Sequence, residues 1–373
     1  MKVVFLKESK KENRVSLVPR SFDSIPKNVE IFFQPNIGKS IGYDDESYLV
    51  SGFKPIKKSD IKTADIIVKL SPLSKSELRL VSDPKQLVIS NCFLVNNAVY
   101  LKRLLNEKIA SLGIELFHED NVFPWLIKNE TLKSNFVSND LIKYLSEHNK
   151  KDKLTKTLEL LERPVLKYLI VNYSYASVEL IKNLLVNGHE ITLLESNQFY
   201  VDVLKNNKVI NELLTVHKGK LTIKSYGFDL LNDECKKCDV LVYTTTTPGG
   251  IAHTRITYDM IVSVKKNGVF VDLSAENGLC CEAINYPNDK RYPYTMVKNT
   301  VCLALNNIPS KFYPKDASDF TCDFILNLLK HFEDNTLDTI KSDYAIKNSM
   351  QTFGGNIVSK TIGESLNLKY KEI

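Results

Sequence analysis

The sequence predicts an α/β protein of two domains, each with a mainly parallel sheet, a cleft between them, and a C-terminal helix that returns to the first domain. Three features predict this arrangement. Short apolar runs alternate with stretches of helical period, which is the pattern of parallel strands joined by helices. The alternation stops once, in a polar segment rich in Lys and Asn at residues 126–163. A helical tail follows the second series.

Composition limits the class of protein. The length of 373 residues agrees with two domains, and a net charge of +6 is too mild to indicate nucleic-acid binding. No apolar run approaches the roughly 20 residues that cross a bilayer, and the N-terminus lacks the apolar region of a secretory signal. The odd number of cysteines, seven, suits a reducing compartment. We therefore expect a soluble, cytoplasmic protein.

Cys235 and Cys238 have the spacing of a redox or zinc pair. No second pair with this spacing accompanies them, so we expect an incidental surface pair and no bound metal.

The first domain is expected to comprise residues 1–135 and 315–373. Its predicted strands are residues 3–6, 29–33, 66–70 and 87–90, with a weaker one at 114–117. The tail is predicted to be helical over residues 317–331 and 343–366, with apolar side chains at Phe320, Phe324, Leu328 and Leu329.

The second domain is expected to span residues 136–314. A helical period over residues 140–161 ends before Pro164. The predicted strands that follow are residues 166–171, 190–194, 221–224, 240–243, 269–273 and 301–304.

The start of this second series has the form of a dinucleotide-binding βαβ unit. Strand 166–171 leads through a short loop into a helix that ends at Gly188, and the next strand ends at Glu195. In such units the loop reads G-x-G-x-x-G and an acidic residue about 20 positions on binds the ribose. The three glycine positions fall on Asn172, Ser174 and Ser177. Both domains are therefore predicted to be Rossmann-like, with a second domain that binds NAD(H) through an altered loop.

Two interpretations of this loop stay open. Asn172 tolerates a left-handed backbone and serine is small, so the loop could keep its shape. Ser174, however, places a side chain where the backbone should touch pyrophosphate, and Tyr173 and Tyr175 add bulk. The segment is either a modified NAD(H) site or a purely structural unit. Glu195 favours NAD over NADP, because a carboxylate repels a 2′-phosphate.

Segments along nearly the whole chain resemble one family. KESKKENRVSLVP at residues 7–19 is similar to the "KE…ENRVALTP" opening of alanine dehydrogenases and proton-translocating nicotinamide nucleotide transhydrogenases. GYDDESY (42–48) and ADIIVKL (64–70) resemble "GFSDEDY" and "ADIIVKV" of that family. TTTTPG (244–249), VDLSAENGLCCE (271–282) and NIPS (307–310) resemble "TTALIPG", "VDLAAENGGNCE" and "DLPG". The resemblance implies that Thr244, Thr245, Pro248, Gly249 and Asn277 contact the nucleotide.

Alanine dehydrogenase chemistry is not favoured by the residues that match it. In that branch an Arg and a Lys hold the substrate carboxylate, and these match Arg14 and Lys69. A His acts as acid–base partner, and its position is occupied by Phe93. The catalytic Asp matches Glu276. Without the His, we expect Arg14 and Lys69 to remain as structural ion-pair residues.

The transhydrogenase branch is the closer match. Its α subunit binds NAD(H) and passes hydride to NADP(H) on a partner subunit, with the nicotinamide positioned by an Arg, a Gln and an Asp. These match Lys128, Glu130 and Lys133, which departs from the pattern because a lysine lacks the planar fork of arginine and a carboxylate cannot replace an amide. The resemblance implies a homodimer that docks on membrane and NADP-binding subunits carried by separate chains.

The sequence thus predicts the soluble NAD(H)-binding subunit of a transhydrogenase, attached to the inner face of a membrane only through partner subunits. The alternative is a non-catalytic family member that acts as a scaffold or sensor. An alanine dehydrogenase-like enzyme comes third.

Overall fold

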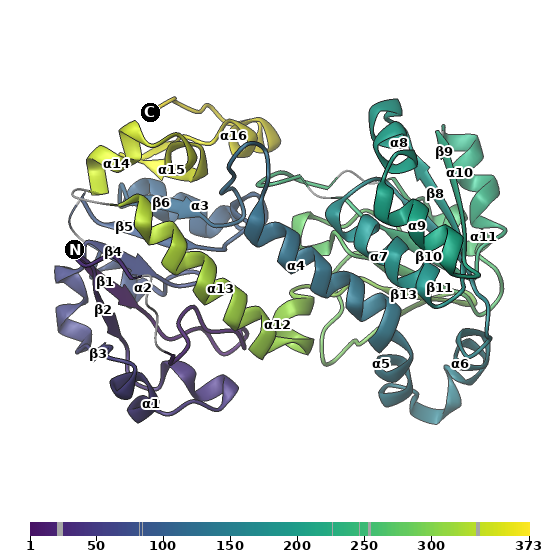
Figure 1. Ribbon diagram of the computed structural model, residues 1–373, viewed down its shortest axis with the longest axis horizontal. Coiled ribbons are helices and arrows are strands. Elements are labelled where there is room, and N and C mark those ends of the chain that lie inside the picture. The colour runs from purple at the N-terminus through teal and green to yellow at the C-terminus, as the bar shows by residue number, and fades with distance from the viewer. Residues whose placement is uncertain are drawn as a thin grey trace. The chain divides into compact units, whose positions relative to one another are not determined.

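The computed structural model describes residues 1–20, 25–81, 83, 85–225, 227–245, 247–252, 255–332 and 336–373 (Figure 1). Thr246, in the expected nucleotide loop, lies outside these residues. The chain divides into two compact units. Unit 1 comprises Met1–Asn129, Pro248–Ile251 and Pro309–Ile373, and unit 2 comprises Glu130–Thr247 and Ala252–Ile308. One boundary between the two units, between Asn129 and Glu130, falls inside helix α4 (Pro124–Asn135).

Unit 1 contains a mixed sheet of eight strands in the order β15-β14-β6-β5-β4-β1-β2-β3. The strands from β1 to β6 pair in parallel, whereas β14 is antiparallel to both β6 and β15. The bounds are β1 (Lys2–Phe5), β2 (Glu30–Phe33), β3 (Lys54–Pro55), β4 (Ile66–Val68), β5 (Leu87–Ser90), β6 (Ala110–Gly113), β14 (Met350–Phe353) and β15 (Asn356–Ile357).

Both faces of this sheet are buried. Along β1, Val3 and Phe5 belong to one apolar cluster, while Val4 and the following Leu6 belong to another. Because neighbouring side chains on a strand point to opposite faces, a central parallel strand reads as a continuous apolar run. This is why the sequence pattern located the central strands.

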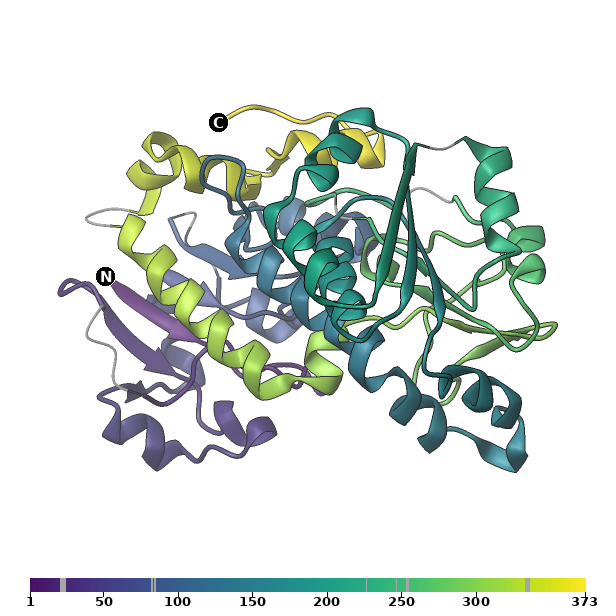
Figure 2. The same cartoon turned by 45° about the vertical axis from the view of Figure 1, so that its right-hand side comes forward.

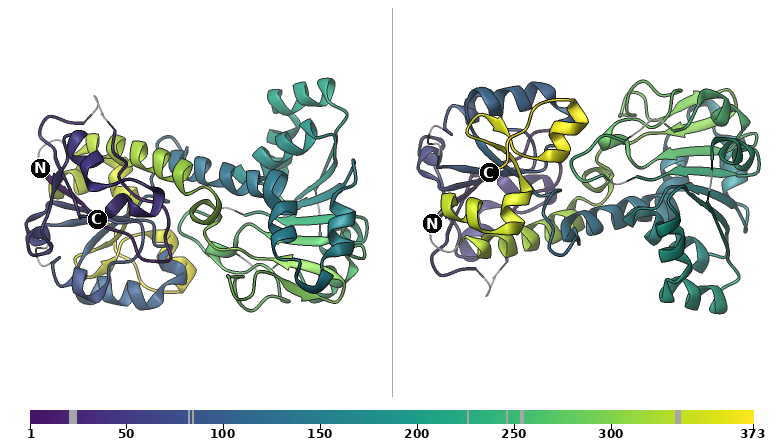
Figure 3. Two further views of the ribbon diagram at one scale, coloured as in Figure 1. Left: turned by 90° about the horizontal axis from the view of Figure 1, so that it is seen from below. Right: turned by 90° about the horizontal axis from the view of Figure 1, so that it is seen from above.

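Helices cover the two faces. α13 (Pro314–Leu328) runs across one face and contributes Cys322 and Ile325 to the cluster that contains Phe5 (Figure 2). The C-terminal segment also packs on unit 1 (Figure 3), so the predicted return of the tail is confirmed. The other helices of this part are α1 (Asp45–Val50), α2 (Lys75–Leu78), α3 (Ala98–Asn106), α12 (Ile308–Phe312), α14 (Thr336–Ser342), α15 (Tyr344–Ser349), α16 (Lys360–Leu366) and the 3-10 helices η1 (Ile37–Ile41), η2 (Lys58–Thr63), η3 (Leu94–Asn96) and η7 (Leu329–His331).

Two predicted elements of unit 1 were wrong. No strand forms at residues 114–117, where the chain turns; the strand lies just before them as β6. Ile114 and Phe117 are nevertheless buried. The segment 343–366, expected to be helical, contains the hairpin β14–β15. Gly354 and Gly355 form its turn with φ values of 55° and 81°, a backbone conformation that favours glycine.

Unit 2 contains a sheet of seven strands in the order β12-β13-β11-β10-β7-β8-β9. All pairs are parallel except β12 with β13. The six predicted strands are present, and β12 was not predicted. The bounds are β7 (Lys167–Val171), β8 (Glu190–Glu195), β9 (Lys220–Ser225), β10 (Val240–Tyr243), β11 (Val269–Asp272), β12 (Thr295–Val297) and β13 (Thr300–Leu303).

The helices of unit 2 surround this sheet. They are α5 (Leu141–Glu147), α6 (Thr155–Leu161), α7 (Tyr175–Val186), α8 (Gln198–Lys205), α9 (Lys208–Val216), α10 (Phe228–Cys235) and α11 (Tyr258–Ser263), with η4 (Phe136–Asp140), η5 (Lys150–Asp152) and η6 (Ala275–Asn277). The helical period predicted over 140–161 is broken between α5 and α6, where Lys151 has a φ of 55°. With two largely parallel sheets, the predicted α/β class is confirmed.

All seven cysteines are free and buried. Cys235 and Cys238 lie in the apolar core of unit 2, so the expected surface pair was wrong. Within the described residues, no group of three or more His, Cys, Asp or Glu side chains could hold a metal ion. In the same part of the chain, no helix is long and apolar enough to cross a membrane.

Candidate functional site

The loop between β7 and α7 keeps the turn of a dinucleotide-binding unit. Asn172 follows the last residue of β7 and has a φ of 74°. This is the left-handed conformation that the first glycine of the loop supplies, and asparagine is the residue type that best replaces glycine there. The turn is therefore kept without glycine, a point that the sequence had left open.

Beyond the turn, the helix N-terminus is closed by its own side chains. The Ser174 hydroxyl accepts from the Ser177 N–H at 3.1 Å, and the Ser177 hydroxyl accepts from the Ser174 N–H at 2.8 Å. Both residues are buried, and they form a reciprocal capping box. A phosphate bound at a helix N-terminus accepts from such N–H groups, so here two of those donors are already satisfied.

The end of β8 is tied to the same loop. The Glu195 carboxylate accepts from the Tyr173 N–H at 2.6 Å through one oxygen and from the Asn197 N–H at 2.7 Å through the other. The Tyr173 ring stacks on Tyr200, with centroids 4.6 Å apart and an interplanar angle of 7°. A carboxylate has about four acceptor positions, so Glu195 retains capacity for a ribose hydroxyl.

The other residues expected at the nucleotide are divided between the units. Thr244 follows β10, and its hydroxyl donates to the Asn172 carbonyl at 2.8 Å. Asn277 donates to the Thr247 carbonyl at 3.4 Å, and the neighbouring Thr245 is half-buried. Pro248 and Gly249 belong to unit 1. There Gly249 has a φ of 67°, and an added Cβ would lie 2.5 Å from Leu116.

A buried lysine of α4 is clamped between two carboxylates in unit 2. The Lys133 ammonium lies 2.8 Å from a Glu130 oxygen and 3.0 Å from a Glu276 oxygen, and the three side chains are 3%, 5% and 8% exposed. The second Glu276 oxygen accepts from the Asn307 N–H at 2.6 Å. Lys128, by contrast, is exposed and belongs to unit 1. The structure thus brings together Glu130, Lys133 and Glu276 but not Lys128.

The two carboxylates stabilise the charged form of Lys133. Loss of hydration lowers the pKa of Lys133, but attraction to Glu130 and Glu276 outweighs it and leaves the pKa above its ordinary value. Burial raises the pKa of Glu130, against the opposing effect of Lys133.

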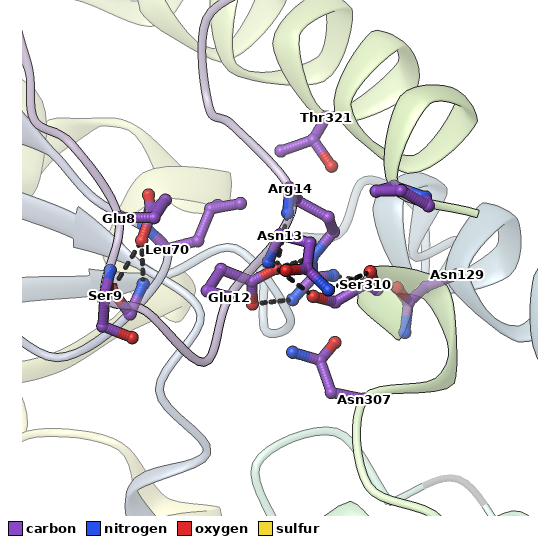
Figure 4. A network of polar contacts seen from close by, with 12 residues as sticks. Glu8, Ser9, Glu12, Asn13, Arg14, Leu70, Asn129, Asn307, Ser310 and Thr321 are labelled. Atoms are coloured by element: carbon purple, nitrogen blue, oxygen red, sulfur yellow. Dashed lines mark hydrogen bonds and ion pairs between the residues drawn. The ribbon is translucent and has the colours of Figure 1, made fainter. Parts of the chain in front are cut away.

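In unit 1, the expected ion pairs of Arg14 and Lys69 are present. The Arg14 guanidinium donates to both oxygens of Glu12 at 2.9 Å and to Asn129 at 3.3 Å (Figure 4). Lys69 donates to both oxygens of Glu77 at 2.8 Å. Bidentate, charge-assisted pairs of this kind are strong and fix orientation. Both cations therefore already have a carboxylate partner within the chain.

Glu8 belongs to the same polar network and was not singled out from the sequence. Its carboxylate accepts from the Leu70 N–H at 2.8 Å, the Ser71 N–H at 2.8 Å and the Ser71 hydroxyl at 2.6 Å (Figure 4). Loss of hydration and the nearby Glu12 raise the pKa of Glu8 to about 7. The sequence could have pointed to Glu8, because it lies in the segment of residues 7–19 that resembles the family.

Phe93, which stands in place of the acid–base histidine, follows β5 in a strained backbone conformation. Its φ is 41°, which is rare for a bulky residue and is found chiefly where the surrounding structure enforces it. A phenyl ring can neither accept nor donate a proton. A titratable group that the sequence analysis missed is Glu115, which is buried and accepts from Gln351 at 2.8 Å. Burial raises the pKa of Glu115 to about 7.

Two α/β units, a βαβ loop with a left-handed turn residue and an acidic strand end define the class of proteins with a dinucleotide-binding fold. Comparison with known families gives the particular group. The N-terminal domain of the alanine dehydrogenase/PNT family matches residues 4–126, and the C-terminal domain of the same family matches residues 200–360. The chain belongs to the alanine dehydrogenase/PNT family.

Known relatives match over nearly their full length but with low identity. The chain is 22% identical to an alanine dehydrogenase of Methanococcus maripaludis, covering 96% of this chain and 94% of that protein. It is 21% identical to an alanine dehydrogenase of Staphylococcus epidermidis, covering 100% and 99%.

Solved structures show the same fold. An L-alanine dehydrogenase matches with a TM-score of 0.79 at 17% identity, covering 98% of this chain and 99% of that chain. A transhydrogenase from Sinorhizobium meliloti matches with a TM-score of 0.69 at 18% identity, covering 96% and 100%. At these identities the likeness establishes the fold alone.

Proposed function

We propose that this chain is a non-catalytic member of the alanine dehydrogenase/PNT family that acts as a scaffold or sensor subunit. The observation that carries the proposal is the buried pair between Lys133 and Glu276. Glu276 occupies the position that the resemblance assigns to a catalytic carboxylate. A carboxylate held by a buried ammonium at 3.0 Å and by a backbone N–H at 2.6 Å is fixed and desolvated, so it cannot turn toward a substrate.

Two further features support the loss of chemistry. Phe93 removes the acid–base group from the position where alanine dehydrogenases require it. The phosphate loop also fails to fit a pyrophosphate as a glycine loop does, because the Ser174 and Ser177 hydroxyls cap the helix in its place.

A second candidate is the soluble NAD(H)-binding subunit of a proton-translocating transhydrogenase. The left-handed Asn172 and the position of Glu195 favour it, because both keep the outline of an NAD site. In this case the chain would be a homodimer in the cytoplasm, docked on membrane and NADP-binding subunits, with hydride passing between NAD(H) and NADP(H). An alanine dehydrogenase comes third, since Phe93 opposes it.

The deciding experiment is a titration of the purified full chain with NADH, followed by nucleotide fluorescence and calorimetry. The proposal predicts no saturable binding up to millimolar NADH. The variant in which Asn172, Ser174 and Ser177 are all replaced by Gly tests whether the loop is the cause, and gain of binding in this variant shows that the remaining pocket is intact. Saturable NADH binding by the unaltered chain, with hydride transfer to NADP⁺ once partner subunits are supplied, would establish the second candidate instead.

A further inference from the structure

We propose that unit 2 carries a binding pocket for a compact dianion of the phosphate type, at the end of the sheet opposite the Asn172 loop. The pocket has a volume of about 210 Å³. Its lining includes the first residues of three neighbouring strands, Lys167 of β7, Glu190 of β8 and Lys220 of β9. The nucleotide loop follows the last residue of β7, so the two places are separated by the length of the strand.

The register of the strands puts the polar side chains on one face. Lys167, Glu190 and Lys220 are direct neighbours across β7, β8 and β9. Two residues further along the same face, Thr192 lies beside Thr222. A parallel sheet normally presents apolar side chains to helices on both faces. Here a polar surface stands at the edge of the sheet, where β9 is the last strand (Figure 1).

Charge on this surface is unbalanced. The Glu190 carboxylate lies 3.1 Å from the Lys220 ammonium and 3.6 Å from that of Lys167. At the end of α10, the Glu234 carboxylate lies 2.9 Å from Lys237 and 3.0 Å from a further lysine of β9, Lys224. Each carboxylate is thus shared by two ammonium groups. Lys224 does not line the pocket, so its three lining lysines and two lining glutamates leave one positive charge in excess.

Both carboxylates stay ionised at neutral pH. Hydrogen bonding to Lys220 lowers the pKa of Glu190. Burial acts to raise the pKa of Glu234, but its bonds to Lys237 and Lys224 bring it below the ordinary value. The excess positive charge therefore persists at neutral pH.

The size and the hydroxyl groups favour a small ligand. A volume of about 210 Å³ holds several waters, at roughly 30 Å³ each, and is below the roughly 300–1,000 Å³ of pockets for drug-sized ligands. No hydrogen bond within the described chain uses the hydroxyl of Thr192 or Thr222, so both can bind an oxyanion. The pairs of Lys167 and Lys220 with Glu190 are largely exposed and therefore weak, so these two lysines can turn toward an anion at little cost. Lysine is also a common phosphate ligand.

The test is isothermal titration calorimetry of the full chain with inorganic phosphate at neutral pH, with ionic strength held constant by chloride. We expect saturable binding at one site. Lys220→Ala and Lys237→Ala should each weaken it by about tenfold or more, the size expected for loss of a charged hydrogen bond. Thr192→Val keeps the charge and the volume and should also weaken binding.

Lys236→Ala is the matched control. Lys236 is adjacent to Lys237 but pairs with Asp233 at 2.8 Å and does not line the pocket. Its variant should bind phosphate as the unaltered chain does. Heat that does not saturate, or an equal loss in the Lys236 and Lys237 variants, would overturn the proposal. This outcome is independent of NADH binding and of any catalytic activity.

Discussion

Replacing Lys133 by Met tests the buried cluster most sharply. The change keeps the length of the side chain but removes the charge that lies 2.8 Å from Glu130 and 3.0 Å from Glu276. Removing one partner of a buried pair leaves an uncompensated buried charge, which destabilises proteins by about 3–5 kcal/mol. With all three side chains at most 8% exposed, we expect a loss within this range at pH 7.5.

The pH dependence gives a second readout. Without Lys133, burial holds the folded-state pKa of Glu130 further above the unfolded value of about 4.3, because the opposing attraction of the ammonium is lost. A carboxyl group whose pKa is raised in the folded state does not destabilise the protein below its unfolded pKa. It destabilises the protein progressively as pH rises through the folded pKa. The loss should therefore be smaller at pH 5 than at pH 7.5.

The assay is urea unfolding followed by circular dichroism at both pH values. Lys236→Met is the control, because Lys236 and Asp233 are 54% and 60% exposed and such pairs contribute about 1 kcal/mol or less. A loss below about 1 kcal/mol for Lys133→Met at pH 7.5, or a loss that does not change with pH, would refute the assigned ion cluster.

Three further variants test other parts of the structure. Ser174→Ala removes the cap of α7 and should lower the free energy of unfolding by about 1 kcal/mol in urea titration. Arg14→Lys cannot keep both bonds to Glu12 and should cost about 2 kcal/mol in the same assay. Glu115 has a folded pKa of about 7, which is above its unfolded value, so its contribution to the free energy of unfolding is lost as pH rises through 7. The free energy of unfolding of the unaltered chain should therefore fall between pH 5 and 8, and Glu115→Gln should remove up to about 3 kcal/mol of that fall. The stabilising contribution of Glu8 also falls as pH rises, in the unaltered chain and in the variant alike. Only the difference between their two pH profiles therefore reports on Glu115.

Much of the fold could be predicted because buried strands have a simple pattern. The run at β1 is apolar on both faces, and it therefore stands out without any knowledge of its partners. The hairpin β14–β15 was missed because Gln351 and Thr352 are polar yet fully buried. Their hydrogen bonds go to Glu115 and to Ser111, far away in the sequence. A strand whose burial depends on remote polar partners has no period to detect.

The candidate site could be predicted in outline but not in its contacts. Asn172 was expected to take a left-handed turn from its residue type alone, and it does. The mutual capping of Ser174 and Ser177 was not expected, because the two serines were weighed only by their size in place of glycine. Lys133 was matched by resemblance to a residue that positions the nicotinamide, whereas it lies on helix α4 with its ammonium 3.0 Å from Glu276. Such pairing arises from the tertiary fold and cannot be read from spacing along the chain.

The most direct test of the central claim is a search for hydride transfer by the unaltered chain. The chain at high concentration is mixed with NADH, pyruvate and ammonium, and separately with NADH and NADP⁺, while nucleotide absorbance is followed. A non-catalytic family member predicts no change above the rate without protein in either mixture. A protein-dependent rate that disappears in Glu276→Ala would contradict the account, because it would show that this carboxylate serves the reaction despite its bond to Lys133.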